Sequence, residues 1–198
     1  MLISQVIIKH LPSYLGFQGI FYYLNERKKY TIGMSQNGVS TTHAIGAISL
    51  SFIYYLIENR NIYNILANFS TGYFTFDFLC CLFNMKNSIL KYAYLYHHIA
   101  SIYICNILPK YGAPSILFWA ELSNIPTYIV YYYIKNRNRN SVFFWKYIQL
   151  ITYLIIRIPI LGYLLYKKII FLQDEKYKIY PVLPVYIMGL IWSIKLLK

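Results

Sequence analysis

The chain has 198 residues, of which 58% are hydrophobic and 13% are charged, and its net charge is +13. Soluble domains contain about a quarter charged residues, so this composition argues against a soluble globular protein. The basic residues lie in short clusters at the ends of apolar segments, without the basic stripe of a nucleic-acid-binding protein. We therefore expect a single-domain integral membrane protein whose partners are membrane lipids and not nucleic acid.

Residues 1–24 form the first apolar segment, but Lys9, His10 and Pro12 interrupt it. The segment has no small-residue cleavage site, so we do not expect a removable signal peptide. Two arrangements remain open for it: a tilted first span, or a helix that lies in the membrane interface.

Six further apolar segments are long enough to cross a bilayer, which takes about 20 residues. They are residues 40–57, 66–83, 92–108, 114–134, 141–166 and 179–197. The predicted fold is therefore all-α, an integral membrane helical bundle of six to seven transmembrane helices. We place an N-terminal segment at residues 1–39 and the transmembrane domain at residues 40–198.

The loops that join these segments carry unequal positive charge on the two sides of the membrane. Eleven basic residues fall on one side: Arg27, Lys28, Lys29, Lys86, Lys91, Lys135, Arg137, Arg139, Lys146, Lys195 and Lys198. Six fall on the other side: Arg60, Lys110, Lys167, Lys168, Lys176 and Lys178. Because loops rich in lysine and arginine stay in the cytosol, we expect the first side, and with it the C-terminus, to be cytosolic.

Ionisable side chains inside the apolar segments are costly in lipid and by default indicate a functional site. At about 1.5 Å per helical residue, His43, Asp77, His97 and His98 lie about 5–9 Å from the cytosolic ends of their spans. Lys146 lies at a similar depth in its own span. These residues form a shallow group that faces the cytosol.

The adjacent histidines His97 and His98 are the main candidates for a functional site in the shallow group. Adjacent residues point about 100° apart on a helix, so we expect one histidine to face a cavity and the other to bond a neighbouring helix. Asp77 could orient an imidazole, which makes His97, His98 and Asp77 the candidate catalytic residues. The same three residues with His43 are the candidate binding residues. The alternative, equally weighted, is that these side chains only hydrogen-bond between helices.

Glu121 and Arg157 form a second, deeper group, about 20–24 Å from the cytosolic ends of their spans. Opposite charges at one depth keep both groups ionised in lipid, so we interpret them as a structural ion pair.

A metal site is not expected from the histidine spacing. No two histidines fall at the i, i+3 or i, i+4 spacing of helical metal ligands, so we predict neither a metal nor another cofactor. Cys80, Cys81 and Cys105 have no CxxC spacing, and we expect them to pack as small apolar side chains.

Four short motifs follow one another in the chain: STTHA at residues 40–44, STGYFTFD at 70–77, YHHI at 96–99 and ELSNIP at 121–126. In this order they resemble the S-x-x-H-A, S-x-G-Y-F-x-x-D, double-histidine and E-L-S-x-x-P segments of the TLC-domain family. Arg157 resembles the arginine of that family's following span. The family contains ceramide synthases, a translocon-associated protein and a ceroid-lipofuscinosis protein.

This resemblance implies a helical bundle with a lipid-accessible cavity, in the endoplasmic reticulum or a related internal membrane. Ceramide synthases carry an H-D-x-x-D signature after the double histidine, and here residues 119–124 read WAELSN instead. The chain is therefore more similar to the other members of the family, which are tied to membrane lipid composition or trafficking.

Three functional hypotheses remain. The first is a multi-pass protein that binds lipid in its bundle and influences membrane lipid composition or trafficking. The second is an acyltransferase with acyl-CoA as co-substrate, in which His97 or His98 is the base or acyl acceptor and Asp77 orients it. The third, ranked last, is a seven-helix receptor or channel.

Overall fold

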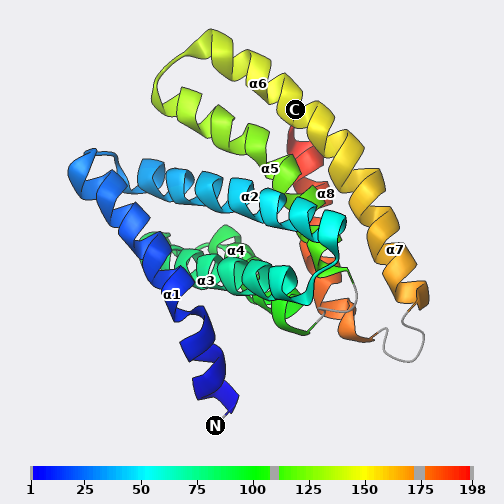
Figure 1. The fold of residues 1–198 in the computed structure, drawn as a ribbon. Coiled ribbons are helices and arrows are strands. Elements are labelled where there is room, and N and C mark those ends of the chain that lie inside the picture. Colours follow the sequence, from blue (N-terminus) through cyan, green and yellow to red (C-terminus); the bar gives the residue numbers. More distant parts are fainter. Residues whose placement is uncertain (1, 108–111, 172–176, 197–198) are drawn as a thin grey trace.

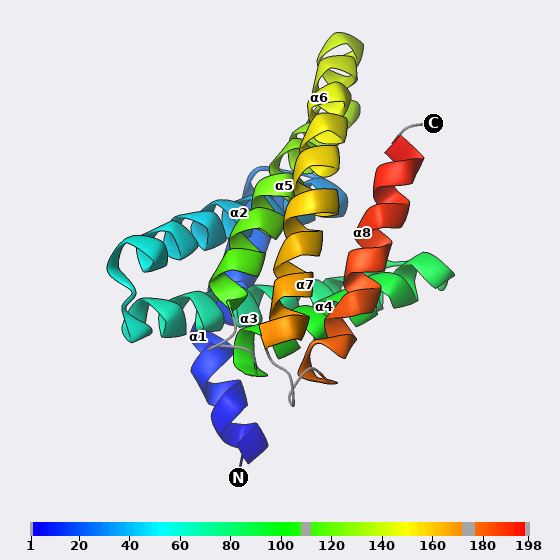
Figure 2. The same ribbon diagram turned by 90° about the vertical axis from the view of Figure 1, so that its right-hand side faces the viewer.

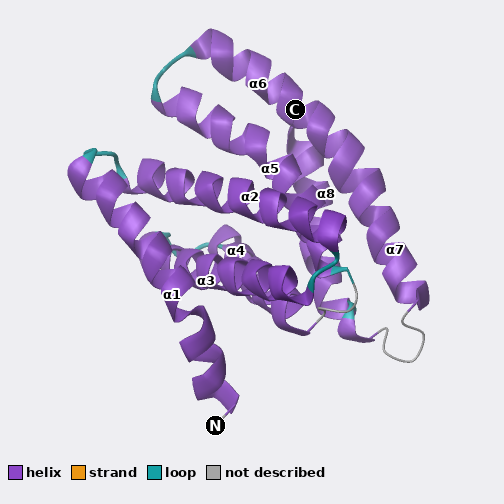
Figure 3. Ribbon diagram, viewed as in Figure 1, coloured by secondary structure: helices purple, strands orange, loops and turns teal. Residues whose placement is uncertain are grey.

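The computed structural model describes residues 2–107, 112–171 and 177–196, which are helical almost throughout. No strand occurs among these described residues (Figure 3). The α-helices are α1 (Leu2–Tyr22), α2 (Ile32–Ile57), α3 (Arg60–Asn84), α4 (Ile89–Ile107), α5 (Ala113–Lys135), α6 (Arg139–Thr152), α7 (Leu161–Phe171) and α8 (Leu183–Leu196). The predicted all-α fold is confirmed (Figure 1).

Polar caps set the ends of the first long helices. The Thr31 side chain accepts a hydrogen bond from the Met34 backbone N–H at 3.3 Å and so caps the start of α2. Glu58 ends that helix in the left-handed conformation, and the Asn59 side chain caps α3. This two-residue turn reverses the chain, so α2 and α3 run antiparallel to one another (Figure 1).

Helix α2 begins at Ile32, eight residues before the predicted start of its span at residue 40. The predicted boundary between residues 39 and 40 therefore falls inside a helix. From the sequence, residues 32–39 are not expected in the span because Ser35, Gln36 and Asn37 interrupt the apolar sequence. All three are buried or half-buried, so their polar side chains face the interior of the bundle and not lipid.

Helices α6 and α7 are joined without a break by a π-helical stretch, η3 (Tyr153–Ile160). Pro159 lies in this stretch and has no N–H to donate, and a wider helical turn accommodates that missing bond. The same stretch carries Arg157, whose side chain is buried. Short π-helical stretches are frequent at functional sites.

Three helices of the described chain are long and apolar enough to cross a membrane: Ile32–Ile57, Arg60–Asn84 and Arg139–Ile170. The shorter helix Tyr180–Leu196 is also apolar. Helices α4 and α5 occupy two of the other predicted spans, but tyrosines and polar residues lower their mean hydropathy. The total of six to seven spans therefore stays a prediction, while the helical bundle itself is established.

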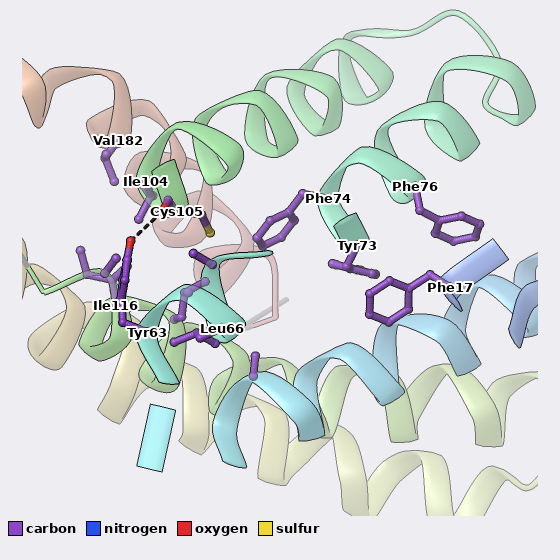
Figure 4. Close-up of a cluster of buried hydrophobic side chains, with 14 of the residues drawn as sticks. Phe17, Tyr63, Leu66, Tyr73, Phe74, Phe76, Ile104, Cys105, Ile116 and Val182 are labelled. Carbon is purple, nitrogen blue, oxygen red and sulfur yellow. Dashed lines mark hydrogen bonds between the residues drawn. The ribbon is translucent and has the colours of Figure 1, made fainter. Parts of the chain in front are cut away.

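The core lies between α1, α2, α3, α4 and α5, with a cluster of aromatic and aliphatic side chains (Figure 4). Phe17 of α1 packs against Tyr73 of α3, with ring centroids 5.5 Å apart. The Tyr63 hydroxyl donates to the Cys105 carbonyl oxygen at 2.6 Å and ties α3 to α4. Many large apolar side chains are exposed on the outside, as expected of helices that face lipid.

The remaining helices enclose the space beside this core. Helix α2 packs against both α3 and α5, and α8 packs against η3 and α4. The turn between α5 and α6 and the C-terminal end of α8 lie toward the same end of the molecule (Figure 2). The helices α2, α3, α4, α5, η3 and α8 thus surround a common interior.

Candidate functional site

An aspartate–histidine pair joins α3 to α4. His98 Nε2 lies 3.1 Å from Asp77 Oδ2, and both side chains are buried. Gln36 of α2 donates from Nε2 to the other carboxylate oxygen of Asp77 at 2.7 Å. The hydroxyl of Tyr73 lies 3.5 Å from Asp77 Oδ2. Asp77 is therefore held from three helices, and it orients His98 as the sequence predicts of an imidazole in this group.

Cys81 is the third member of this cluster. Its Sγ lies 3.8 Å from His98 Nε2, and Gln36 Nε2 lies 4.0 Å from the same sulfur. Asp77, Cys81 and His98 are all buried, and their potential ligand atoms lie within 4.8 Å of one another. From the sequence we expect Cys81 only to pack as a small apolar side chain, although its i+4 spacing from Asp77 places the two on one helix face.

His43 is completely buried and lies between three helices. Its ring stacks on Tyr73 with centroids 3.9 Å apart and an interplanar angle of 9°. Its Nε2 lies 3.2 Å from Ser70 Oγ on α3, and its Nδ1 lies 3.7 Å from Glu121 Oε1 on α5. His43 therefore fixes α2 against both neighbours.

Glu121 and Arg157 are bridged and do not form the direct ion pair that the sequence predicts. Asn124 donates from Nδ2 to Glu121 Oε2 at 3.3 Å and accepts at Oδ1 from Arg157 Nη2. Arg157 Nε also donates to Ser123 Oγ at 3.1 Å, and its guanidinium lies over the Tyr153 ring. Both charged residues are described, and no contact within 4.0 Å joins them directly. Asn124, at i+3 from Glu121, supplies the link because its amide can donate and accept at once.

His97 and His98 diverge as adjacent helical residues should, with ring planes 73° apart. His98 bonds the neighbouring helix α3 through Asp77. His97 Nδ1 is buried without a hydrogen-bond partner among the described residues. His98 Nδ1 is likewise without a partner there, so the two histidines differ in that His98 is held by Asp77 through its Nε2.

The candidate residues border a cavity of about 620 Å³, here called the polar cavity because charged and polar side chains are numerous in its wall. His97, His98, Asp77, Glu121 and Arg157 all border it, so the two predicted depth groups share one space. His43 lies behind this wall, in contact with Glu121. Lys146 is exposed on α6 and does not border the cavity, so it does not belong with the shallow group.

A narrower apolar cavity of about 70 Å³ adjoins the polar one. Both are bordered by five residues: Phe74, His97, Glu121, Asn124 and Arg157. Beyond these shared residues the lining is mostly hydrocarbon, from Ile104, Ile116, Leu117, Leu161, Leu165, Val182 and Val185. Ser101 and Tyr186 also border it, and their hydroxyls donate to the carbonyl oxygens of His97 and Ile158. The two cavities thus lie on either side of a shared wall, and the smaller one has the more apolar lining.

The fold and the cavity define a helical protein whose apolar helices indicate a membrane location and whose interior holds a cavity bordered by charged and polar side chains. The family model of the TLC domain matches residues 33–198, and the chain belongs to the TLC-domain family. The match begins in the first turn of α2, in agreement with the start of that helix. No curated protein and no solved structure matches the chain.

Proposed function

We propose that this protein binds a membrane lipid in the two joined cavities and through this binding influences membrane lipid composition or trafficking. The single observation that supports the proposal is the change from a polar to an apolar lining across His97, Glu121 and Arg157. A lipid has the same two parts. Its head group needs hydrogen-bonding partners, and its chain needs a dry hydrocarbon wall.

The polar cavity suits a head group that carries an amine or a hydroxyl. The carboxylates of Asp77 and Glu121 accept hydrogen bonds from such groups, and Arg157 and Lys195 supply donors at other points of the wall. The remaining border includes hydroxyl and amide side chains, which adapt to either role. Because this lining contains acidic, basic and neutral polar side chains, it can bind a head group whether that group is charged or neutral.

We place the protein in the endoplasmic reticulum or a related internal membrane, with the C-terminus in the cytosol. The excess of basic residues in one set of loops supports this orientation. In it, the part of the polar cavity that Lys195 and Leu196 border, at the C-terminal end of α8, lies toward the cytosol.

Two substitutions on α8 test lipid binding. Val185 borders the apolar cavity, whereas Ile187, two residues further on, is exposed on the outside. Val185→Phe should fill the cavity and reduce the lipid retained by the purified protein at least several-fold, as measured by native mass spectrometry. Ile187→Phe should retain as much lipid as the unchanged protein. Equal retention in both variants would contradict the proposal.

Acyl transfer is a second candidate function, favoured by the position of His97. This histidine borders both cavities, so its ring would meet a lipid where the chain joins the head group. As a general base, His97 would take the proton of a lipid amine or alcohol. The oxygen or nitrogen would then attack the thioester carbonyl of acyl-CoA, and the thiol of coenzyme A would leave.

A lipidome of expressing cells separates the two functions. If the protein transfers acyl groups, a product class should rise with the unchanged protein and not with His97→Ala at equal membrane abundance. If the protein only binds lipid, both proteins should shift the lipidome in the same way. His98→Ala is a poor substitute here, because it also breaks the contact with Asp77.

A further inference from the structure

Asp77, Cys81 and His98 bring three different metal-ligating atoms into one buried cluster. We propose that this cluster binds a zinc ion through one carboxylate oxygen, one thiolate sulfur and one imidazole nitrogen, with a fourth coordination position open to the polar cavity. The proposal adds a metal site to lipid binding and does not depend on it. The histidine spacing gave no hint of such a site, because only one of its ligands is a histidine.

The helices themselves place the three ligands. Asp77 and Cys81 lie at i and i+4 on α3, so successive turns present them on one face. His98 approaches the same face from α4, which packs along α3. Two rigid helices thus supply the donors, and no loop has to become ordered for the metal to bind.

Two of the three distances between the ligand atoms lie close to the edges of a coordination tetrahedron. Zinc bonds of about 2.0–2.3 Å place tetrahedral ligand atoms roughly 3.3–3.6 Å apart. His98 Nε2 lies 3.1 Å from Asp77 Oδ2 and 3.8 Å from Cys81 Sγ. The third edge, from the Asp77 carboxylate to Cys81 Sγ, lies within 4.8 Å, so shifts of up to about an ångström in the side chains would admit the ion at its normal bond lengths.

Of the two ligands Asp77 and His98, only Asp77 has a hydrogen-bond partner that supports it from outside the cluster. Gln36 donates to the carboxylate oxygen of Asp77 that does not face His98, as outer partners of metal-binding carboxylates do. His98 Nδ1 has no acceptor among the described residues. Since such an acceptor normally orients a metal-bound imidazole, we expect an affinity below that of fully supported zinc sites.

The donor types favour zinc over magnesium and calcium. Thiolate and imidazole are poor ligands for magnesium and calcium, whereas zinc accepts sulfur, nitrogen and oxygen together. Three protein ligands leave one tetrahedral position unfilled, which is the arrangement of zinc sites that bind water or a substrate. All three ligand residues border the polar cavity, so that position can take a water or a head-group oxygen.

Metal titration of the purified full-length protein tests the site. After chelation and dialysis, the protein should bind about one Zn²⁺ per chain. Co²⁺ in its place should give the thiolate charge-transfer absorption and the intense visible bands of a tetrahedral sulfur-ligated ion. Absence of saturable binding to the folded protein would overturn the proposal, without the need for any variant.

The neighbouring cysteines supply matched controls. Cys81→Ser should abolish the cobalt–thiolate absorption and weaken zinc binding at least tenfold. Cys80→Ser, one residue away, and Cys105→Ser, on α4, should leave both unchanged. Retention of the thiolate band by Cys81→Ser would assign the metal to another sulfur and overturn the site. Gln36→Leu, which removes only the outer support of Asp77, should weaken zinc binding about 10–100-fold.

The two proposals can fail separately. Val185→Phe fills the apolar cavity and does not touch the metal ligands, so it should lose lipid and keep zinc. Cys81→Ser should lose zinc and keep lipid in the apolar cavity. If the unchanged protein binds zinc but retains no lipid, the proposed metal site stands and the proposed function is wrong.

Discussion

His43 Nδ1 lies 3.7 Å from Oε1 of Glu121, and both side chains are almost completely buried. This contact joins α2 to α5 and links a residue predicted to be shallow with one predicted to be deep. The depth of His43 was underestimated because α2 begins at Ile32. Counted from there, His43 lies about 16 Å along the helix, close to the depth of Glu121.

His43 should matter more for stability than for any chemistry. His43→Ala removes a buried ring that stacks on Tyr73, so it should lower the free energy of unfolding by about 2–4 kcal/mol. Thermal denaturation in detergent, followed by circular dichroism, measures this loss. Ser70→Ala removes only the hydrogen bond to His43 and should cost about 1 kcal/mol. Equal stability of His43→Ala and the unchanged protein would contradict this role.

Arg157 and Glu121 should behave as partners in one buried network although they do not touch. Arg157→Met leaves the Glu121 carboxylate buried without its nearest cation and should cost about 3–5 kcal/mol. The double variant Glu121→Gln/Arg157→Met removes both charges and should recover part of that loss. A double-mutant cycle on unfolding free energies gives the coupling, and strict additivity would mean that the bridge through Asn124 carries no energy.

Gly72 allows α1 to pack closely against α3. A Cβ atom at this position would lie 2.7 Å from the backbone nitrogen of Tyr14, and backbone atoms cannot move aside as a side chain can. Gly72→Ala should therefore destabilise the protein by about 1–3 kcal/mol. Gly16→Ala on α1 is the control, because a Cβ there meets nothing within 4 Å. Similar melting temperatures for the two variants would argue against this packing.

The orientation in the membrane can be tested at two turns. Asn136→Cys, between α5 and α6, should react with a membrane-impermeant maleimide added to the cytosolic side. Asn59→Cys, between α2 and α3, should react only after the membrane is permeabilised. The natural cysteines give a low background because they are buried or half-buried. The reverse pattern would invert the predicted topology and place the C-terminus on the other side.

The sequence predicts the fold well because apolar periodicity and charge at helix ends are local signals. It also predicts that Asp77 lies at the depth of the double histidine and could orient one of the two imidazoles, and the structure shows that this one is His98. It fails at the start of α2, where Gln36 and Asn37 are polar because they face the interior of the bundle. An apolar-run criterion cannot distinguish such residues from a loop.

The sequence shows that a charged residue lies in an apolar segment, but it does not show which side chain that residue bonds to. Glu121 and Arg157 are predicted to lie at one depth. In the structure the Asn124 amide lies between them and hydrogen-bonds to both, so the two charged groups are linked only indirectly. Cys81 was missed for a different reason. Its i+4 relation to Asp77 is visible in the sequence, and a search restricted to histidine pairs does not find it.

The most direct test of the central claim is to locate a bound lipid. A bifunctional lipid with a photoactivatable group in its chain is crosslinked to the protein in membranes, and the modified residues are mapped by mass spectrometry. We predict labels on residues that border the apolar cavity, such as Leu117, Leu165 and Val185. We also predict that an excess of unlabelled lipid removes these labels. Labels confined to outward-facing side chains such as Ile187 and Ile191, with no competition, would contradict lipid binding inside the bundle.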